Sequence, residues 1–566
     1  MIVITHRSFL PDKLKVTSWE MLEPFFNQLL EREIHSKEEL EKWLKDRSEL
    51  EAFVSEDLAW RYVRMTCDTI NKDLEQAYLF FVTEIEPKIS PLNDLLNKKL
   101  VSSKFIDELD TDKYFIYLRS IKKEIEIFRE ENVPLFAEIS TESQKYGSII
   151  GSLSVEIDGK ELTLQQASNY LKDPDRNKRE EAFKKINSTR MEHADELDEL
   201  FNKLIALRHK VAVNADFTNF RDYMFAAMGR FDYLPEDCFA FHDAIQKEVM
   251  PLVKNFTEKR EQELGYKLRP WDMEVDTKNR AALEPFTSGA DLLDKTVNCF
   301  RKVDEYFAWC IQTMDNMDRL DLESRKGKAP GGYNYPMSET SVPFIFMNAA
   351  SSTRDVETMV HEGGHAVHSF LSKDLELAAF KSCPSEVAEL ASMSMELISY
   401  DGQDEFYKNK EDFNRAKEEH LEGIIKILPW IATIDKFQHW IYTNPTHTID
   451  ERKKYWVELS KEFGTGLVDW SGYENIQMYG WQKQLHLYEV PFYYIEYGMA
   501  QLGALAVWRN FIHNKPKAIE QYKAALSLGY TKTIGEIYKT AGIEFNFSAS
   551  YINELMDFVK DELKKL

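Results

Sequence analysis

The sequence has little glycine, proline or cysteine, and each shortage narrows the range of possible folds. Its 566 residues include 22 Gly and 18 Pro, well below the average share of these two residues. Turns are therefore scarce, helix is favoured, and collagen-like or low-complexity chains are excluded. The five cysteines are odd in number, widely spaced and without a CxxC pair: Cys67, Cys238, Cys299, Cys310 and Cys383. Free thiols in a reducing compartment fit this pattern better than a disulfide framework, which predicts a cytoplasmic protein.

Excess basic charge and long apolar runs are also lacking. The 72 Lys and Arg residues against 96 Asp and Glu give a net charge of −24, so a nucleic-acid backbone or an anionic bilayer would on average be repelled. The longest charge-free stretches, such as 340–353 and 497–508, fall short of the ~18 apolar residues that span a bilayer. Residues 1–16 lack the basic and apolar segments of a signal peptide. We expect no nucleic-acid partner, no membrane partner and no secretion.

Helical periodicity is what the sequence has in abundance. Charged residues make up 30 % and hydrophobic residues 43 % of the chain, which is typical of a folded protein. Over residues 18–142, apolar residues recur every three or four positions among charges, which predicts successive amphipathic helices. Residues 36–39, Ser-Lys-Glu-Glu, resemble a capping box that opens one of them. The Ser-Pro pair at 90–91 is predicted to end or start another.

A change of period marks the first break in the helical pattern. Residues 152–164 alternate apolar and polar positions around Asp158 and Gly159, a dipeptide that favours the type I′ turn of a β-hairpin. Helices resume after the hairpin, and a soft boundary is placed near residue 190. The predicted division is a helical N-terminal lobe, 1–190, with a hairpin near 152–164, and a second region, 191–566.

The sharpest motif in the second region is HEGGH, which contains HExxH. In a helix, His361 and His365 lie one turn apart on one face, so both imidazoles can reach one zinc ion, and Glu362 beside them can act on water. The alternative is a polar helix face that carries a solvated glutamate. Gly363 and Gly364 argue against it, because each weakens a helix by about 1 kcal/mol relative to Ala. Either a substrate or a crossing helix should therefore approach the backbone closely there.

A third metal ligand must come from elsewhere, because zinc that hydrolyses amides takes three protein ligands and leaves a position for water. The position where metzincins carry another histidine is Leu371, so a downstream carboxylate is the natural candidate. The next predicted helix offers Glu386, Glu389 and Glu396. The helix dipole already explains an acid in the first turn, at Glu386. Glu389 has small residues beside it, which indicates close packing. We predict Glu389 as the third ligand and Glu396 as the acceptor for a zinc-bound imidazole.

Resemblance to a known family is carried by three stretches, HEGGHAVHSFLS, AELASMSMEL and HLYEVPFYYIEYGMAQLGA. They look like the successive signatures of the zinc oligopeptidases related to thimet oligopeptidase, and most like oligoendopeptidase F and Pz-peptidase-like enzymes. The resemblance extends to IDGKELTLQQASNYLKDPDRNKREEAF, LRPWD, GKAPGGY and LSLGYTKTIGEIYKTAGIEF. It therefore covers most of the chain from about residue 150, and the N-terminal part matches only in being helical. We predict a mainly α fold whose two helical lobes enclose a deep channel, as the family implies, with a small β-sheet beside the HExxH helix.

The resemblance also implies roles for individual residues. The ligand glutamate of the family falls on Glu389, in agreement with the choice made above. The residues that steady the tetrahedral intermediate fall on His486, Tyr493, Tyr494 and Tyr497. Because the tyrosine spacing differs between branches of the family, we favour Tyr494 and Tyr497 as catalytic without excluding Tyr493, which is also a predicted substrate contact. Aromatic residues at helical spacing are more often core, but beside a zinc site neutral phenols can stabilise an oxyanion.

A loop and a strand before the motif are the predicted peptide contacts. The loop is rich in glycine, and residues 342–348 form a short apolar run that we predict as a strand, with Pro343 suggesting an edge position. An edge strand beside a catalytic helix offers unpaired backbone groups to an extended peptide. The predicted substrate-binding residues are Gly331, Gly332, Phe346 and Asn348.

The leading hypothesis is a cytoplasmic endopeptidase for short oligopeptides, with one zinc ion per chain and Glu362 as general base. The chain would be a monomer or a small homo-oligomer. A di-iron carboxylate oxidase would need a second ExxH motif, and no other histidine follows a glutamate by three residues. A helical peptide-binding protein with a vestigial metal site is the remaining alternative, and the presence of Glu362 argues against it.

Overall fold

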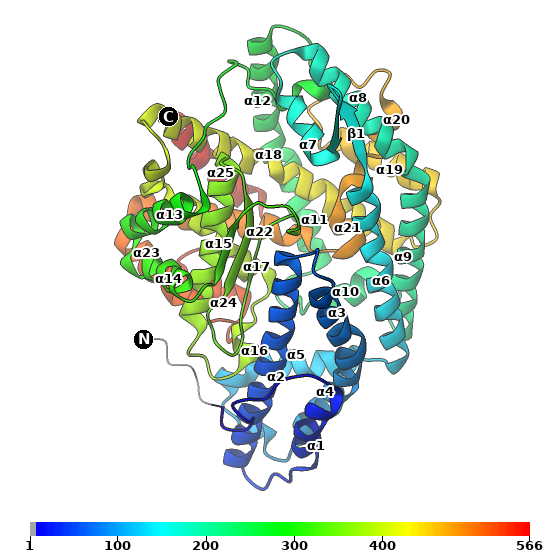
Figure 1. The fold of residues 1–566 in the computed structure, drawn as a ribbon, viewed down its shortest axis with the longest axis vertical. Coiled ribbons are helices and arrows are strands. Elements are labelled where there is room, and N and C mark those ends of the chain that lie inside the picture. Colours follow the sequence, from blue (N-terminus) through cyan, green and yellow to red (C-terminus); the bar gives the residue numbers. More distant parts are fainter. Residues whose placement is uncertain (1–6) are drawn as a thin grey trace.

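The computed structural model describes residues 7–566, and helices make up most of it (Figure 1). Residues 1–6 lie outside the described residues. They are part of residues 1–16, on which the prediction of no signal peptide rests. The first helices are α1 (Glu23–Glu31), α2 (Lys37–Cys67), α3 (Lys72–Phe80), α4 (Glu86–Val101), α5 (Thr111–Ile127), α6 (Val133–Ser152), α7 (Leu164–Ser168), α8 (Arg176–Glu192) and α9 (Ala194–Asn214). The predicted mainly α class is confirmed.

The remaining helices continue to the C-terminus. Those before the HExxH motif are α10 (Phe220–Ala227), α11 (Pro235–Ala244), α12 (Met250–Leu264), α13 (Gly289–Val303) and α14 (Glu305–Asn316). The others are α15 (Thr353–Ser372), α16 (Ala378–Lys381), α17 (Ser385–Ile398), α18 (Lys410–Thr443), α19 (Ile449–Glu462), α20 (Glu474–Met478), α21 (Leu485–Glu489), α22 (Tyr494–His513), α23 (Lys515–Ser527), α24 (Ile534–Thr540) and α25 (Ala549–Leu563). Across residues 7–566, none of the helices combines the length and the apolar composition that crossing a bilayer requires.

The arrangement of these helices separates an N-terminal group from the rest. Figure 1 shows α1, α2 and α4 at one end of the molecule, with α13, α14 and α23 on one side and α6, α8 and α9 on the other. The N-terminal core runs from Leu10 to Ile121 and also takes in Leu377 and Phe380. A larger core extends from Leu135 onward through the later helices. The boundary near residue 190 and the channel between two lobes stay predictions.

Two local expectations for the N-terminal helices have different outcomes. Ser36 is the N-cap of α2 and accepts a hydrogen bond from the Glu39 backbone N–H at 3.2 Å, so the predicted helix start is confirmed. The expectation that Pro91 ends or starts a helix is wrong, because Pro91 lies inside α4. Proline removes a single backbone hydrogen bond there, and burial of Ile89 and Leu96 on the same helix holds α4 together.

The predicted hairpin is present at the expected residues. Strands β1 (Ser154–Ile157) and β2 (Lys160–Thr163) pair antiparallel. Between them, Asp158 and Gly159 have φ angles of 53° and 72°, the left-handed conformations that a type I′ turn needs at both central positions. The type I′ hairpin is therefore confirmed.

A second, three-stranded sheet lies against the HExxH helix, and its order corrects one prediction. The strands are β3 (Leu320–Glu323), β4 (Tyr333–Tyr335) and β5 (Phe344–Ala349), in the order β3-β5-β4, with β3 parallel and β4 antiparallel to β5. The expected edge strand, β5, is thus the central strand, and β4 is an edge. Pro343 precedes the first paired residue, so its missing N–H removes no ladder hydrogen bond.

The long helix α2 packs against this sheet. Ala59 and Val63 of α2 share a small hydrophobic cluster with Phe344 and Phe346 of β5. Beside them, the hydroxyls of Thr66 and Tyr333 are 2.6 Å apart, a hydrogen-bond distance. The N-terminal region therefore contributes directly to the wall on which the HExxH helix rests.

Candidate active site

Helix α15 presents the two histidines of the HExxH motif. Its N-cap, Ser352, forms a capping box with Asp355, which fixes where the helix begins. The rings of His361 and His365 have centroids 4.9 Å apart, as expected for residues one turn apart on one face. Their side chains retain exposures of 21 % and 20 %, so both can meet a ligand from outside the protein core.

The two glycines of the motif allow other helices to approach α15 closely. A Cβ atom at Gly363 would lie 2.6 Å from Cζ of Phe300, on α13. A Cβ atom at Gly364 would lie 2.7 Å from Cα of Ser392 and 2.8 Å from the carbonyl oxygen of Ala391, both on α17. The predicted close approach is confirmed, and crossing helices make it.

Helix α17 carries the predicted third ligand to this position. The Glu389 Oε2 atom lies 3.4 Å from His361 Nε2 and 3.8 Å from His365 Nε2. One ligand atom from each of the three residues falls within 4.8 Å of the others. Ser392 donates a hydrogen bond to Glu389 Oε2 at 3.0 Å, and Tyr493 donates one to Oε1 at 3.1 Å. The carboxylate is therefore held facing both imidazoles.

A second carboxylate orients the His361 ring. Glu396 Oε1 lies 2.6 Å from His361 Nδ1, and its other oxygen lies 2.9 Å from His420 Nε2. His420, on α18, is linked in turn to the Tyr400 hydroxyl at 2.6 Å. The Glu396 contact matches the sequence prediction. His420 and Tyr400 were missed, because a single histidine in a long amphipathic helix carries no signal that it faces Glu396.

The electrostatics of this group favour a cation. Burial alone would raise the pKa of the Glu389 carboxyl, but His361, His365 and Ser392 together lower it to about 2. Burial would lower the pKa of His361, yet Glu389 and Glu396 raise it well above its ordinary value. The two carboxylates thus stabilise positive charge between them. Two imidazole nitrogens and a carboxylate oxygen are the donor types of a zinc site, so these residues fit a zinc ion.

Glu362 lies next to the two histidines on the same helix and is 7 % exposed. Burial raises the pKa of its carboxyl to about 7; His361 opposes this rise, and Glu389 and Glu396 add to it. The side-chain amide of Asn334, on the edge strand β4, donates a hydrogen bond to the Glu362 carbonyl oxygen at 3.0 Å. Strand β4 therefore runs directly beside the acidic residue of the motif.

His486 and the predicted tyrosines form one cluster at the start of α22. The His486 ring centroid lies 4.9 Å from that of Tyr494, 6.1 Å from that of Tyr497 and 6.3 Å from that of Tyr493. Tyr493 touches Glu389 directly, which joins this cluster to the histidine group. The residues that the resemblance singled out are thus neighbours in space. Burial lowers the pKa of His486 and raises that of Tyr497, so both are neutral hydrogen-bond donors at neutral pH.

A strained turn sets the position of Tyr493. Phe492, fully buried, has a φ of 70°, a left-handed conformation that is rare for a bulky residue. Gln438 accepts a hydrogen bond from the Phe492 N–H at 2.6 Å, and Arg230 donates to its carbonyl oxygen. These contacts hold the turn in place. Sequence reasoning missed Phe492, Gln438 and Arg230, because nothing local predicts a positive φ at phenylalanine.

The predicted substrate-binding residues differ in their exposure: one is buried in the core and the others lie in or beside an exposed loop. Phe346 is fully buried and stacks on Tyr333 with ring centroids 4.8 Å apart, so the prediction that it contacts a substrate is wrong. It lies on the central strand, and α2 covers the face that carries Phe344 and Phe346. Asn348 uses its amide to hold the loop, donating to the carbonyl oxygen of Gly331 at 2.9 Å. Gly331 and Gly332 are exposed in that loop.

Comparisons with known proteins agree over most of the chain. The sequence profile of peptidase family M3 matches residues 169–557, and that of the peptidase M3 N-terminal domain matches residues 9–128. The oligoendopeptidase F homolog of Borreliella burgdorferi is 22 % identical over 94 % of this chain and 91 % of its own. The protein named oligoendopeptidase F, plasmid, of Lactococcus lactis subsp. cremoris is 21 % identical over 72 % of this chain and 66 % of its own. Among solved structures, Pz peptidase A with inhibitor 2 has a TM-score of 0.90 and 25 % identity, with 99 % of both chains covered.

Proposed function

The chain belongs to peptidase family M3, and we propose that it is a zinc-dependent endopeptidase that hydrolyses internal peptide bonds of short oligopeptides. One observation carries the proposal: the donor atoms of His361, His365 and Glu389 converge, and Glu362 lies beside them in the same motif. Such a set of three ligands leaves a further coordination position open for chemistry. The similarity to oligoendopeptidase F proteins supports peptides as the substrates.

Each residue of the cluster would have a distinct task. A single zinc ion held by these three ligands would supply a Lewis acid that polarises the scissile carbonyl and acidifies water. Glu362 would accept a proton from the attacking water and pass it to the leaving amine. His486, Tyr494 and Tyr497 would donate hydrogen bonds to the oxyanion that forms in the transition state. Glu396 would keep the His361 ring in its orientation.

The substrate would lie extended along strand β4. This strand is an edge of its sheet and contacts the backbone of Glu362 through Asn334, so its free side can pair with a peptide backbone. The same path would be lined by Tyr493 and by Gly331 and Gly332, which lie in the loop that Asn348 holds. Helical lobes on both sides would admit a flexible peptide and exclude a folded protein, and the enzyme would act in the cytoplasm.

The test is a peptide-cleavage assay combined with metal analysis. Glu362→Gln should lower hydrolysis of an internally quenched peptide by roughly 10²- to 10⁴-fold while zinc stays bound, because Glu362 is not a ligand. Glu389→Ala should lose zinc and activity together. Glu386→Ala is the matched control on the same helix and should keep the metal.

Two outcomes would contradict the proposal. Retention of zinc and activity in Glu389→Ala, with loss of both in Glu386→Ala, would mean that the ligand assignment is wrong. Wild-type protein that binds the peptide but never cleaves it would favour the alternative, a peptide-binding protein with a vestigial metal site.

A further inference from the structure

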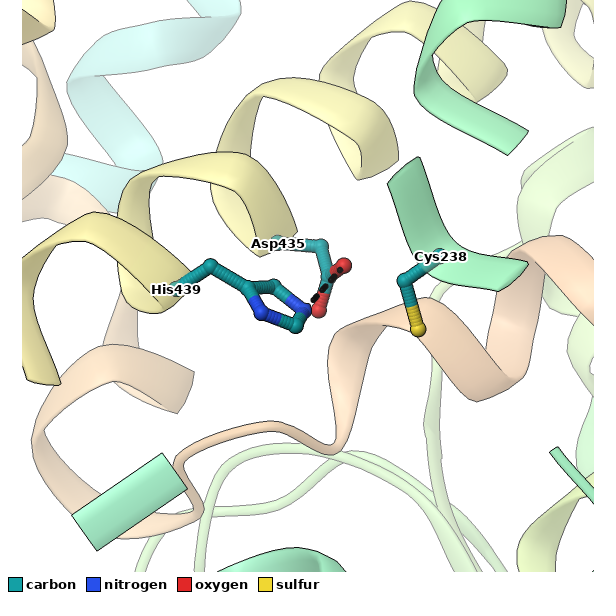
Figure 2. A group of neighbouring side chains, drawn as sticks. All are labelled: Cys238, Asp435 and His439. Atoms are coloured by element: carbon teal, nitrogen blue, oxygen red, sulfur yellow. Dashed lines mark ion pairs between the residues drawn. The ribbon is translucent and has the colours of Figure 1, made fainter. Parts of the chain in front are cut away.

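Outside the active site, one buried cluster combines ligand types that hold transition metals. Cys238 lies on α11, and Asp435 and His439 lie one turn apart on α18. The thiol sulfur, a carboxylate oxygen and an imidazole nitrogen of these residues all lie within 4.8 Å of one another. Figure 2 shows the Asp435 carboxylate between the His439 ring and the Cys238 side chain. Cys238 and Asp435 are 0 % exposed and His439 is 3 % exposed.

Several polar atoms of this cluster lack hydrogen-bond partners. Among residues 7–566, none forms a hydrogen bond with Asp435 Oδ1 or with either ring nitrogen of His439. His439 Nε2 lies 3.2 Å from Asp435 Oδ2, but this contact is not aligned as a hydrogen bond. Only Asp435 Oδ2 is satisfied, by His242 Nε2 at 2.8 Å. A buried polar atom without a partner destabilises the fold, and a cation bound by the free oxygen and a ring nitrogen would remove that cost.

The charges around the cluster also favour a cation. Asp435, Glu386 and Glu496 are buried carboxyl groups in this part of the core, and Arg230 is the buried guanidinium among them. Arg230 donates to Glu496 at 2.7 Å, and Tyr233 donates to Glu386 at 2.6 Å. Asp435 has only the imidazoles of His242 and His439 as ion-pair partners among the described residues. Asp435 and Glu386 both act on the Cys238 thiol. Asp435 thus has no lysine or arginine partner among the described residues, and a divalent ion would balance its buried charge.

We propose that Cys238, Asp435 and His439 form a second metal site, which holds a buried zinc ion through three protein ligands. Sulfur, nitrogen and oxygen donors together suit zinc. Zinc bonds of about 2.0–2.3 Å place ligand atoms at most roughly 4 Å apart, so small side-chain movements close the cluster around an ion. His242 is a positioning residue that holds Asp435 Oδ2. Zinc binding breaks the Cys238 S–H bond, forms a zinc–sulfur bond and releases the proton to solvent.

Such an ion would link helices α11 and α18, which both lie near the candidate active site. The cluster joins α11 to α18, and α18 also carries His420, the partner of Glu396. The His439 ring lies 5.5 Å from that of Phe492, between centroids, in the strained turn that precedes Tyr493. Burial raises the pKa of the Cys238 thiol well above its ordinary value, and Asp435 adds to this rise, so the thiol stays protonated unless a metal binds.

Cobalt is the probe that separates this site from the catalytic one. Because the cluster is closed to solvent, the ion must enter as the chain folds, so the full chain is expressed with Co²⁺ as the added transition metal. Thiolate bound to Co²⁺ gives an intense near-ultraviolet charge-transfer absorption, and imidazole and carboxylate ligands do not. We expect about two cobalt ions per chain and this absorption band in the wild-type protein. Dialysis against a chelator should remove the more exposed catalytic ion and leave the second ion and the band.

Three variants make the result specific. Cys238→Ser should lose the band and one of the two ions. Cys299→Ser is the control, because Cys299 is equally buried but contacts the Ser399 carbonyl oxygen at 3.5 Å, and it should keep both. Glu389→Ala should lose the catalytic ion and keep the band, so failure of the proposed function and failure of this proposal are distinguishable.

The proposal is overturned if the wild-type protein shows no band and no more than one ion. It is equally overturned if the band persists in Cys238→Ser or disappears in Cys299→Ser. Wild-type protein and Glu389→Ala test it even if Cys238→Ser does not fold.

Discussion

Replacement of Gly364 by alanine tests how the crossing of α15 and α17 builds the active site. The new Cβ would lie 2.7 Å from Cα of Ser392, 2.8 Å from the oxygen of Ala391 and 2.9 Å from Cβ of Met395. Two of these atoms belong to the backbone, so no change of rotamer relieves the overlap. The helices must separate by roughly 0.5–1 Å to restore ordinary contact distances. Overpacking of this kind typically destabilises a protein by about 1–3 kcal/mol.

Gly423→Ala is the matched control for this substitution. Gly423 lies in the exposed part of α18, and nothing lies within 4 Å of the place that an alanine Cβ would take there. Both substitutions gain about 1 kcal/mol of helix propensity, so the difference between the two variants isolates the overlap. We expect Gly364→Ala to be less stable than Gly423→Ala by about 3 kcal/mol, the upper end of the overpacking range. Urea denaturation of the metal-free proteins, followed by circular dichroism, measures this difference.

The same separation should affect catalysis. Glu389 is carried by α17, whereas His361 and His365 are carried by α15, so moving the helices apart spreads the three ligands. A displacement near 1 Å can lower activity by about 10²-fold, and kcat/KM should fall by this factor in Gly364→Ala alone. Equal stability and equal kcat/KM in the two alanine variants would refute the argument that this crossing sets the ligand geometry.

Two further predictions concern residues around the ligands. Tyr497→Phe and His486→Phe should each lower kcat by about 10²-fold with little change in KM, because oxyanion donors act in the transition state; steady-state kinetics that give wild-type kcat would assign both to packing. Glu396→Gln should weaken zinc binding by about 10- to 100-fold by removing the charged partner of His361, and His420→Gln should weaken it less. Competitive titration with a chromophoric chelator measures both affinities, and unchanged values would rule out this orienting role.

Local patterns made much of the candidate metal site predictable. The HExxH spacing fixes the relation of His361 to His365 within one helix, and Gly364 indicates that something approaches α15 closely. Small residues around Glu389 indicated which side of the next helix makes that approach. The structure brings Glu389 and Glu396 to His361 as these patterns suggested.

Non-local contacts limited the rest of the sequence analysis. The order of a sheet depends on which strands meet, and Pro343 alone could not reveal that β5 pairs on both sides. The partners His420 and Cys238 belong to segments far from the residues that they meet, and no motif joins them. Tyr493 illustrates the same limit: its contact with Glu389 depends on a strained turn at Phe492, which no propensity predicts.

Helix α2 connects the N-terminal core to the wall of the active site. Leu40 and Trp43, near its start, belong to the N-terminal core, whereas Val63, near its end, packs under the sheet that contains β4. Its 31 residues form a rod of roughly 46 Å at 1.5 Å per residue. A rotation of α2 with the N-terminal core would therefore displace β4, whose Tyr333 is hydrogen-bonded to Thr66 and whose Asn334 contacts Glu362. Under the proposed function, one movement of α2 would change both the peptide path along β4 and the position of Glu362.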